Sequence, residues 1–363
     1  MAKHYFISNR MISKNEDGKE YINEDGKERA QDELRFGHFD TSKAGTKGFE
    51  LIPNFTATKI NSIINYGKNK IDDRGSAAFF KSLYNSMISD KGGDVLIFIH
   101  GFNTDLGDAA KNIRELEEKY IFQESPIKHI VMFTWPAKSP NIPLHYRSDA
   151  KDADDTGDEL YRAFKMLLQF MTEFFKKDIT SGTIPKFCNR KIHLMCHSMG
   201  NRVLRAMLER TQEDIEPLES VFDQIILIAA NINWDDLHEH NRMENIGELC
   251  SRTHVYFKKG DNALDIAKYS KNFANQLGKY GVKNLNKVDG NVFQVDVTKI
   301  TDQEGFQEKL LDHWYYVNSK TVINDIVGVF IGDDVPSKIH STFSKRETVA
   351  SRSFQLKTLQ IEP

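Results

Sequence analysis

The sequence has little cysteine, no long apolar run and no excess of one charge. Its three cysteines among 363 residues, Cys188, Cys196 and Cys250, are too few and too scattered for a disulfide framework or a cysteine-based zinc site. No run approaches the roughly 18 apolar residues of a membrane span, and the first residues form no apolar signal segment. These absences predict a soluble protein in a reducing compartment, the cytoplasm.

Charge and metal-binding motifs exclude further classes. Lys and Arg number 49 against 52 Asp and Glu, so bulk charge indicates no nucleic-acid partner and does not require a membrane surface. The zinc signature His-Glu-x-x-His is missing, and we expect neither a metal nor a cofactor. What the chain does have is a 39% share of hydrophobic residues, with 24 Phe, which is enough for a sizeable buried core.

Short apolar runs alternate with helix-length amphipathic segments. Near-continuous apolar character over such lengths is typical of parallel strands covered on both faces. The expected strands are 95–100, 129–134, 191–196, 224–230, 254–257 and 292–297. Helical spacing of apolar residues predicts helices over 75–89 and 158–176 and after residue 198. The alternation predicts an α/β fold with a doubly wound, mostly parallel sheet and helices on both faces.

The two ends of the chain differ from this core. Residues 1–90 are expected to be an extension packed on the core, with paired edge strands near residues 5–8 and 34–39. Between these strands Asn-Glu-Asp-Gly-Lys-Glu occurs twice, at 15–20 and 23–28, and its Asp-Gly predicts an exposed hairpin or loop. The core is expected over 91–331, and the polar segment 332–363 is expected to be a tail over the surface.

The clearest motif surrounds Ser198, where an apolar strand meets a helix in Cys196-His-Ser-Met-Gly-Asn-Arg-Val-Leu. This layout is typical of a nucleophile elbow, the strained corner that presents a serine hydroxyl in an α/β hydrolase. Cys196 occupies the first small position, where the usual motif has glycine. The simpler alternative is that Ser198 only caps the helix it precedes. Cys196 itself is a poor nucleophile candidate, since its place in the strand is buried.

An oxyanion hole is expected upstream of the elbow. The strand 95–100 leads into His100-Gly-Phe-Asn, at the place in the chain order where this loop supplies one backbone N–H and the residue after the nucleophile supplies the other. The nominated donors are Phe102 and Met199. Asn103 is expected to cap the helix that begins near Asp105.

The acid and the base should follow the serine in the order Ser, Asp or Glu, His. Asp261 lies in the loop after strand 254–257, where the acid belongs, and Asp235 and Asp236 in the preceding loop are its competitors. Beyond the last expected strand the histidines are His313 and His340. Because His340 is in the polar tail, His313 is the predicted base.

Four blocks of the sequence resemble a family of largely uncharacterised bacterial α/β hydrolases, a domain of unknown function distantly similar to esterases and lipases. The blocks are Phe98-Ile-His-Gly-Phe-Asn, Phe133-Thr-Trp-Pro with Tyr146-Arg-Ser-Asp-Ala, Cys196-His-Ser-Met-Gly-Asn-Arg-Val-Leu, and His313-Trp-Tyr-Tyr. The resemblance implies the α/β-hydrolase fold and Ser198, Asp261 and His313 as a catalytic triad. The chain departs from the family after strand 224–230, where Asn231-Ile-Asn replaces a Pro-Asp-Ile-Asp-like run.

Substrate contacts are less well defined. Trp135, Tyr146 and Arg147 could form an acyl-pocket wall and an anion contact, or only pack a loop and face solvent. Residues 262–290 could form a cap over the site or an ordinary surface face. Within this range Lys268, Lys271, Lys279, Lys283 and Lys287 interleave with aromatic residues, which would suit an anionic head group, nucleic acid or a solvated amphipathic face.

These features together predict a serine hydrolase that cleaves a carboxylic ester or a related acyl bond through an acyl-enzyme. The expected substrate is a small molecule or a lipid with an acyl group. Two alternatives stay open: a phospholipase or lipase acting at a lipid interface, and a non-catalytic binding module on a hydrolase scaffold.

Overall fold

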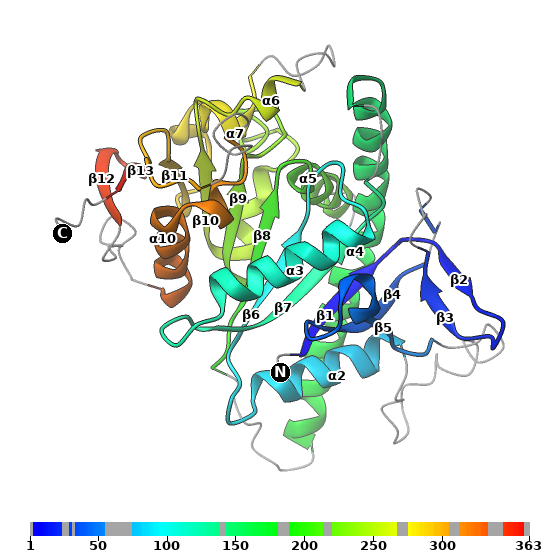
Figure 1. The fold of residues 1–363 in the computed structure, drawn as a ribbon. Helices are drawn as coiled ribbons and strands as arrows, with labels where there is room; N and C mark the ends of the chain where they lie inside the picture. Colours follow the sequence, from blue (N-terminus) through cyan, green and yellow to red (C-terminus); the bar gives the residue numbers. More distant parts are fainter. Residues whose placement is uncertain are drawn as a thin grey trace.

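In the computed structural model the described residues are 3–23, 29–30, 33–54, 75–137, 142–180, 189–212, 220–266, 275–304, 312–332 and 344–358. Within them, one large sheet runs through the middle of the molecule (Figure 1). Its strand order is β12-β13-β11-β10-β9-β8-β6-β7-β1-β4-β5. The strands are β1 (Lys3–Ser8), β4 (Arg35–Asp40), β5 (Phe49–Leu51), β6 (Asp94–Ile99), β7 (Ile127–Thr134), β8 (Ile192–His197), β9 (Phe222–Ile228), β10 (Cys250–Phe257), β11 (Val292–Asp296), β12 (Ser344–Ala350) and β13 (Ser353–Thr358).

The central strands from β13 to β1 are parallel, and antiparallel pairs occur at both edges. All six strands expected in the core are present within a few residues of their predicted bounds. Side chains of β6 alternate between two buried clusters: Val95 and Ile99 enter one, and Leu96 and Phe98 the other. Burial on both faces is why these strands read as continuous apolar runs.

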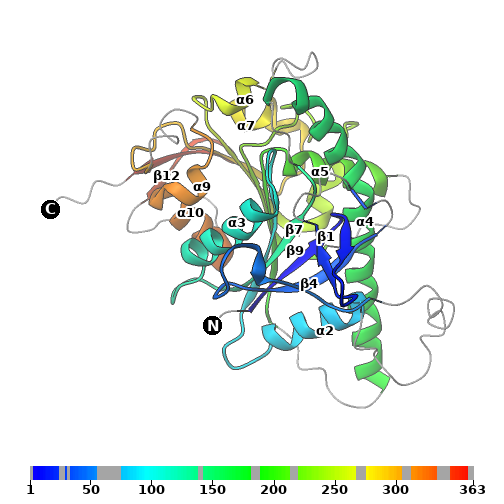
Figure 2. The same cartoon turned by 45° about the vertical axis from the view of Figure 1, so that its right-hand side comes forward.

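Helices cover both faces, as predicted (Figure 2). The long helices are α2 (Gly75–Met87), α3 (Leu106–Tyr120), α4 (Ile142–Thr180), α5 (Gly200–Thr211) and α10 (Lys320–Ile331). Apolar residues of α2, α4 and α5 belong to one buried cluster and those of α3 and α10 to the other. Helix α4 is longer than the predicted 158–176; Tyr146, Ala150 and Ala153 continue its buried face toward the N-terminus. None of the helices in the described ranges is long and apolar enough to cross a bilayer.

The N-terminal strands join the main sheet. The predicted pairing of β1 with β4 is confirmed, but β1 also pairs in parallel with β7 and so lies inside the sheet. The expected hairpin forms from β2 (Ile12–Lys14) and β3 (Glu20–Ile22), with Gly18 in its turn at φ 76°. Of the second copy of the repeat, residues 24–28 lie outside the described residues.

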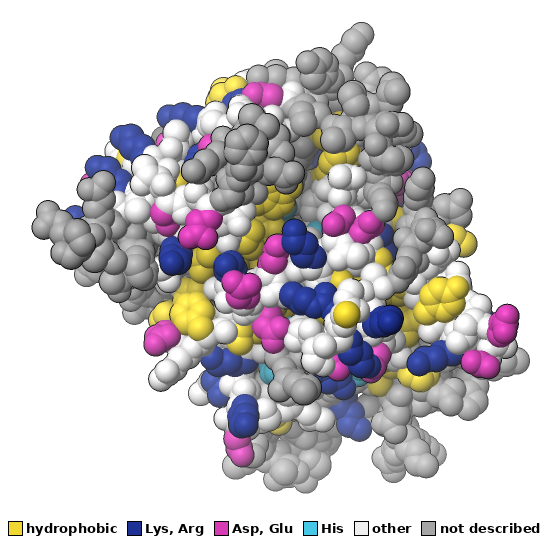
Figure 3. All heavy atoms as spheres, viewed as in Figure 1, with side chains coloured by type: hydrophobic (Ala, Val, Ile, Leu, Met, Phe, Trp, Pro, Cys, Tyr) yellow, Lys and Arg dark blue, Asp and Glu magenta, His cyan; other side chains and the backbone are white. Residues whose placement is uncertain are grey.

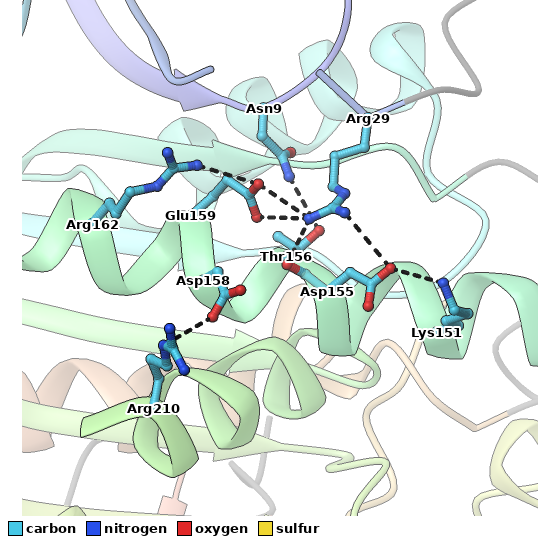
Figure 4. A network of polar contacts seen from close by, with 9 residues as sticks. All are labelled: Asn9, Arg29, Lys151, Asp155, Thr156, Asp158, Glu159, Arg162 and Arg210. Atoms are coloured by element: carbon cyan, nitrogen blue, oxygen red, sulfur yellow. Dashed lines mark hydrogen bonds and ion pairs between the residues drawn. The ribbon is translucent and has the colours of Figure 1, made fainter. Parts of the chain in front are cut away.

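A network of polar contacts fastens this N-terminal segment to α4 (Figure 4). The Arg29 guanidinium lies 3.1 Å from Glu159 Oε1 and donates to the Asp155 carbonyl oxygen at 2.8 Å. Asn9 donates from its side-chain amide to Thr156 Oγ1 at 3.1 Å. The N-terminal residues are therefore part of the same packed body as the core.

The prediction of a C-terminal surface tail over 332–363 is wrong for residues 344–358. These residues form β12 and β13, and β13 pairs in parallel with β11. Arg346 on β12 makes a fully buried ion pair with Asp325 of α10, with Nη2 2.8 Å from Oδ2. The segment reads as polar although part of it is buried: polar Arg346 and Gln355 are buried along with the apolar Phe354 and Leu356.

Candidate active site

The carboxyl ends of parallel strands meet at one edge of the sheet, and the predicted site residues follow these ends. His100 follows β6, Ser198 follows β8, and Asp261 lies four residues after the end of β10. Short helices gather at the same edge: α6 (Ala263–Ile266), α7 (Leu277–Tyr280) and α9 (Tyr315–Asn318). His313 lies just before α9.

Ser198 forms the corner between β8 and α5. Its φ is 52°, in the left-handed region that a residue with a side chain rarely adopts. Its backbone N–H donates to the Ile228 carbonyl oxygen at 3.0 Å. A Cβ on Gly200 would lie 2.4 Å from the Ile99 carbonyl oxygen, so only glycine lets α5 pass this close to β6. These are the geometric features of a nucleophile elbow.

The alternative that Ser198 is a helix cap is not what the structure has. Helix α5 begins at Gly200, and its N-cap residue is Met199, which makes no side-chain capping hydrogen bond. Cys196 is fully buried in β8, and burial raises the pKa of its thiol far above the ordinary value. A thiol held protonated is a poor nucleophile, which agrees with the sequence argument.

Asn201 braces the corner, a role that the sequence reasoning missed. Its Nδ2 donates to three carbonyl oxygens: those of Cys196 and Ser198, each at 3.0 Å, and that of Ile228 at 3.3 Å. One side chain thereby ties the end of β8, the corner and the end of β9 together. The Asn in Ser-Met-Gly-Asn was the available signal, because a buried amide next to a strained corner needs partners.

The loop after β6 lies directly against the serine. A Cβ on Gly101 would come within 2.9 Å of Ser198 Cβ, so the close approach of the two loops requires glycine here. Among the described residues, no acceptor is found for the backbone N–H of Phe102 or of Met199.

Asn103 does not cap α3 as expected. The cap is Asp105, which forms a capping box with Asp108, while Asn103 takes a left-handed turn at φ 53°.

Asp261 and His313 lie in direct contact. Asp261 is fully buried, and its Oδ2 is 2.7 Å from His313 Nδ1. Its Oδ1 accepts a hydrogen bond from the Leu264 N–H at 3.1 Å. Burial raises the pKa of Asp261, and the contact with His313 opposes that rise. Since Nδ1 is engaged by the carboxylate, Nε2 is the ring atom left to exchange a proton with a nucleophile.

The competing acids are engaged elsewhere. Asp235 pairs with Lys283 at 3.3 Å, and Asp236 lies 3.6 Å from the buried Arg205 guanidinium. His340 lies outside the described residues. In the described part of the chain, Asp261 and His313 are thus the acid and histidine that the fold brings to the elbow.

A second ion pair that the sequence did not indicate lies beside the first. Lys258 is 4% exposed, and its Nζ lies 2.8 Å from Asp312 Oδ1 and 2.5 Å from Gln303 Oε1. Asp312 has φ 58° and directly precedes His313. The loop of the acid and the loop of the histidine are therefore joined twice.

His197 links the elbow to the histidine loop. Its Nε2 lies 3.3 Å from the His313 carbonyl oxygen, and the two rings are 4.7 Å apart. Burial lowers the pKa of His197 well below the ordinary value, so the ring is neutral and donates to that carbonyl. His197 is thus engaged with the backbone of the histidine loop.

Ser198 and His313 line one cavity of about 530 Å³. Its wall includes Phe102 and Tyr146, whose rings are 5.7 Å apart. Tyr146 donates from its hydroxyl to Asn231 Oδ1 at 2.6 Å, and burial raises the pKa of that hydroxyl to about 12. The full lining is Gly101, Phe102, Asn103, Thr104, Asp108, Lys111, Asn112, Glu115, Tyr146, His197, Ser198, Asn231, Ala263, Leu264, His313, Trp314, Val317 and Asn318.

One nominated pocket residue, Trp135, lies away from this cavity, and the prediction for Arg147 is not tested. Trp135 is fully buried and absent from the lining; its indole stacks on His100 at 5.4 Å and donates to the His100 carbonyl oxygen at 3.1 Å. It packs the loop rather than forming an acyl-pocket wall. The side chain of Arg147 lies outside what the structure describes.

Residues 262–290 contribute Ala263 and Leu264 to the cavity wall. Residues 267–274, with Lys268 and Lys271, lie outside the described residues. Of the remaining lysines, Lys279 pairs with Asp265 at 2.6 Å and Lys283 with Asp235. Acidic and basic side chains are interspersed across the described face in Figure 3. Two of the described lysines of this segment are therefore paired with acidic side chains. No group of three or more metal-ligating side chains stands together in the described ranges.

Comparison with known proteins gives a match at the level of a family. A family described as "Alpha/beta hydrolase of unknown function (DUF900)" matches residues 76–329, a range that contains Ser198, Asp261 and His313. No curated protein matches the chain. Among solved structures, the chain is similar to the lin2722 gene product of Listeria innocua, at 13% sequence identity over 73% of this chain and 98% of that chain, with a TM-score of 0.32.

Proposed function

The chain belongs to the DUF900 family of α/β hydrolases, and we propose that it is a serine hydrolase that cleaves a carboxylic ester or a related acyl bond. The nucleophile is Ser198, the base is His313 and the orienting acid is Asp261. The observation that carries the proposal is the buried 2.7 Å contact between Asp261 and His313, because His313 lines the same cavity as Ser198.

The chemistry follows from the position of each group. His313 Nε2 takes the Ser198 proton as the hydroxyl oxygen attacks the acyl carbon, and Asp261 stabilises the resulting imidazolium. The N–H groups of Phe102 and Met199 donate to the oxyanion. The imidazolium then gives its proton to the departing alcohol, which leaves an acyl-Ser198. Water, deprotonated by His313, attacks that ester and restores the serine.

The test is covalent labelling of the full-length protein with a fluorophosphonate probe, with the modified peptide identified by mass spectrometry. Label on Ser198, together with hydrolysis of a p-nitrophenyl acetyl or butyryl ester, is the expected result. Ser198→Ala should lose the label and lower kcat by at least about 10⁴-fold. Cys196→Ala is the matched control and should keep both. Equal labelling of wild type and Ser198→Ala would refute the proposal, and a protein that neither labels nor hydrolyses would favour the binding-module alternative.

We favour a dispersed ester over a lipid aggregate as the substrate because of how the exposed apolar residues are distributed over the surface. The exposed large hydrophobic residues of the described chain are spread over the β2–β3 hairpin, α7, α10 and β12: Met11, Tyr21, Tyr280, Ile331 and Val349. A lipase that works at an interface presents a contiguous apolar patch around its site. We expect equal rates on a short-chain ester below and above its solubility limit. A rate that rises on micelles or vesicles would support the lipase alternative.

A further inference from the structure

Arg10 is a buried cation in the N-terminal segment, outside the family match at 76–329. It is 1% exposed. Its Nη2 donates to the Thr104 carbonyl oxygen at 2.8 Å, and its Nε donates to Thr134 Oγ1 at 2.9 Å. The strand register sets this position, because Ser8 at the end of β1 pairs with Thr134 at the end of β7. The N-terminal strand thus delivers a guanidinium to the loop after β6.

The loop of residues 100–104 is held from inside by its own polar groups. His100 Nε2 accepts from the Trp135 N–H at 3.1 Å and lies 3.2 Å from Thr134 Oγ1, so its other nitrogen, Nδ1, carries the proton and donates to the Gly101 carbonyl oxygen at 3.0 Å. Thr104 Oγ1 donates to the same carbonyl at 3.2 Å. Burial lowers the pKa of His100 to about 3, which keeps the ring neutral and this pattern intact at neutral pH.

Arg10 joins the two ends of this arrangement. One nitrogen of its guanidinium holds Thr104, at the end of the loop, and another holds the hydroxyl of Thr134, which contacts His100 at the start of the loop. Phe102 lies between those two anchor points. Burial lowers the pKa of Arg10 to about 10, and the nearby charges of Asp105 and Asp108 oppose that fall, so Arg10 stays charged at neutral pH. Desolvating a charge is expensive, and the hydrogen bonds to Thr104 and Thr134, together with the two carboxylates, compensate for it.

We propose that Arg10 is a positioning residue that fixes the oxyanion loop, so that the Phe102 N–H points to where the acyl oxygen becomes negative. The inference rests on the proposed serine-hydrolase function. It assigns to the N-terminal segment, which precedes the matched family range, a part in forming the active site. Arg10 touches no reacting atom. Its effect should therefore concentrate on transition-state stabilisation and leave substrate binding nearly unchanged.

Arg29 supplies a matched control. Its backbone pairs with that of Arg10 in an isolated antiparallel bridge, but its guanidinium binds Asp155 and Glu159 of α4 (Figure 4). Arg29→Met removes an arginine that anchors the same segment without touching the loop. A merely structural role for Arg10 predicts that Arg10→Met and Arg29→Met behave alike.

The experiment compares wild type, Arg10→Met, Arg10→Lys and Arg29→Met on a p-nitrophenyl ester, with an alkyl boronic acid as an analogue of the tetrahedral intermediate. Losing an oxyanion donor outright costs roughly 10²–10³ in kcat, so displacing one should cost about 10- to 100-fold. Arg10→Met should show that loss with KM changed less than about threefold, and boronate affinity should fall in proportion to kcat. Arg10→Lys, which keeps the charge, should recover part of it. Arg29→Met should lower Tm and leave kcat within about twofold of wild type.

Thr134→Val is the second variant, since it is nearly isosteric and removes only the hydroxyl between Arg10 and His100. It should lower kcat severalfold, with a proportional loss of boronate affinity and little change in KM. This variant keeps the test available if Arg10→Met does not fold. An unchanged kcat in both variants, or equal kcat losses in Arg10→Met and Arg29→Met, would overturn the inference while Ser198-dependent hydrolysis stands. Hydrolysis that survives Ser198→Ala would instead overturn the proposed function.

Discussion

The two halves of the candidate site are held together in different ways. The half that carries Ser198 is fixed by main-chain geometry: β6 and β8 are adjacent, Gly200 lets α5 cross close to Ile99, and Asn201 ties three carbonyl oxygens. The half that carries His313 consists of loops joined by two side-chain pairs, one buried and one partly exposed. One pair joins residues 52 positions apart in the chain, Asp261 and His313. A short local segment therefore determines the first half, whereas the second depends on distant charges.

The largest expected effect on kcat comes from removing the Asp261 charge in the half of the site that carries His313. Asp261→Asn keeps the shape but removes the charge that stabilises the His313 imidazolium, so kcat should fall by roughly 10⁴-fold. The free energy of unfolding of the variant should instead rise relative to wild type as pH increases. Burial raises the pKa of Asp261 in the folded state, so its contribution to stability is full below the unfolded pKa and is lost as pH rises through the folded pKa. Asparagine has no such loss.

The measurement is therefore kcat together with Tm at pH 4 and pH 8. The difference in Tm, variant minus wild type, should become more positive at pH 8. A difference that becomes more negative would mean that the Asp261–His313 contact stabilises the protein by more than burial of the carboxylate destabilises it. The ion pair would then contribute more to the position of His313 than we infer.

The second pair allows a cleaner separation of position from chemistry. Lys258→Met leaves the Asp312 carboxylate, whose side chain is 20% exposed, without its cation, which should cost about 1–3 kcal/mol. Because Asp312 precedes His313 at a positive φ, kcat should also fall, by about 10- to 100-fold, as the imidazole loses its position. Adding Asp312→Asn should restore much of the Tm, since asparagine tolerates the left-handed conformation and carries no charge.

The control for that experiment is Lys191→Met, which removes a lysine paired with Asp223 at 3.2 Å, outside the cavity lining. It should leave kcat unchanged. If Lys258→Met lowered Tm but not kcat, the second pair would be part of the scaffold alone, and the contrast between the halves would rest on Asp261 and His313 only.

The same contrast between local and long-range contacts explains which parts of the fold and the site could be predicted from the sequence. The strands, the order of the site residues and the elbow were predictable because apolar runs and the segment 196–200 are local signals. Lys258 with Asp312, and Arg10 with Thr104, were not, because nothing in either segment alone marks its partner. Strands β12 and β13 were missed for a related reason: a mainly polar segment looks like surface until the pairing of β13 with β11, and of β12 with β13, is known.

A smaller effect is expected from the brace within the elbow half. Asn201→Ala leaves three buried carbonyl oxygens with one donor fewer, so the free energy of unfolding should drop by about 1–3 kcal/mol and kcat by less than about tenfold. Asn201→Asp should be worse than Asn201→Ala, because it directs a carboxylate at those carbonyls. The reverse order, measured by urea unfolding, would mean that the amide is not what holds the corner.

The smallest effect should come from Cys196→Gly, which installs the residue usual at this position of the elbow. If the corner is fixed by Gly200, Asn201 and the neighbouring strands, the identity of residue 196 should hardly matter to the reaction. The substitution empties a small buried volume and adds backbone freedom in β8, so a loss of about 1 kcal/mol in stability is expected, with kcat within about twofold of wild type. A kcat change beyond tenfold at unchanged Tm would show that the thiol shapes the elbow directly, and main-chain contacts would then not suffice to hold the serine half.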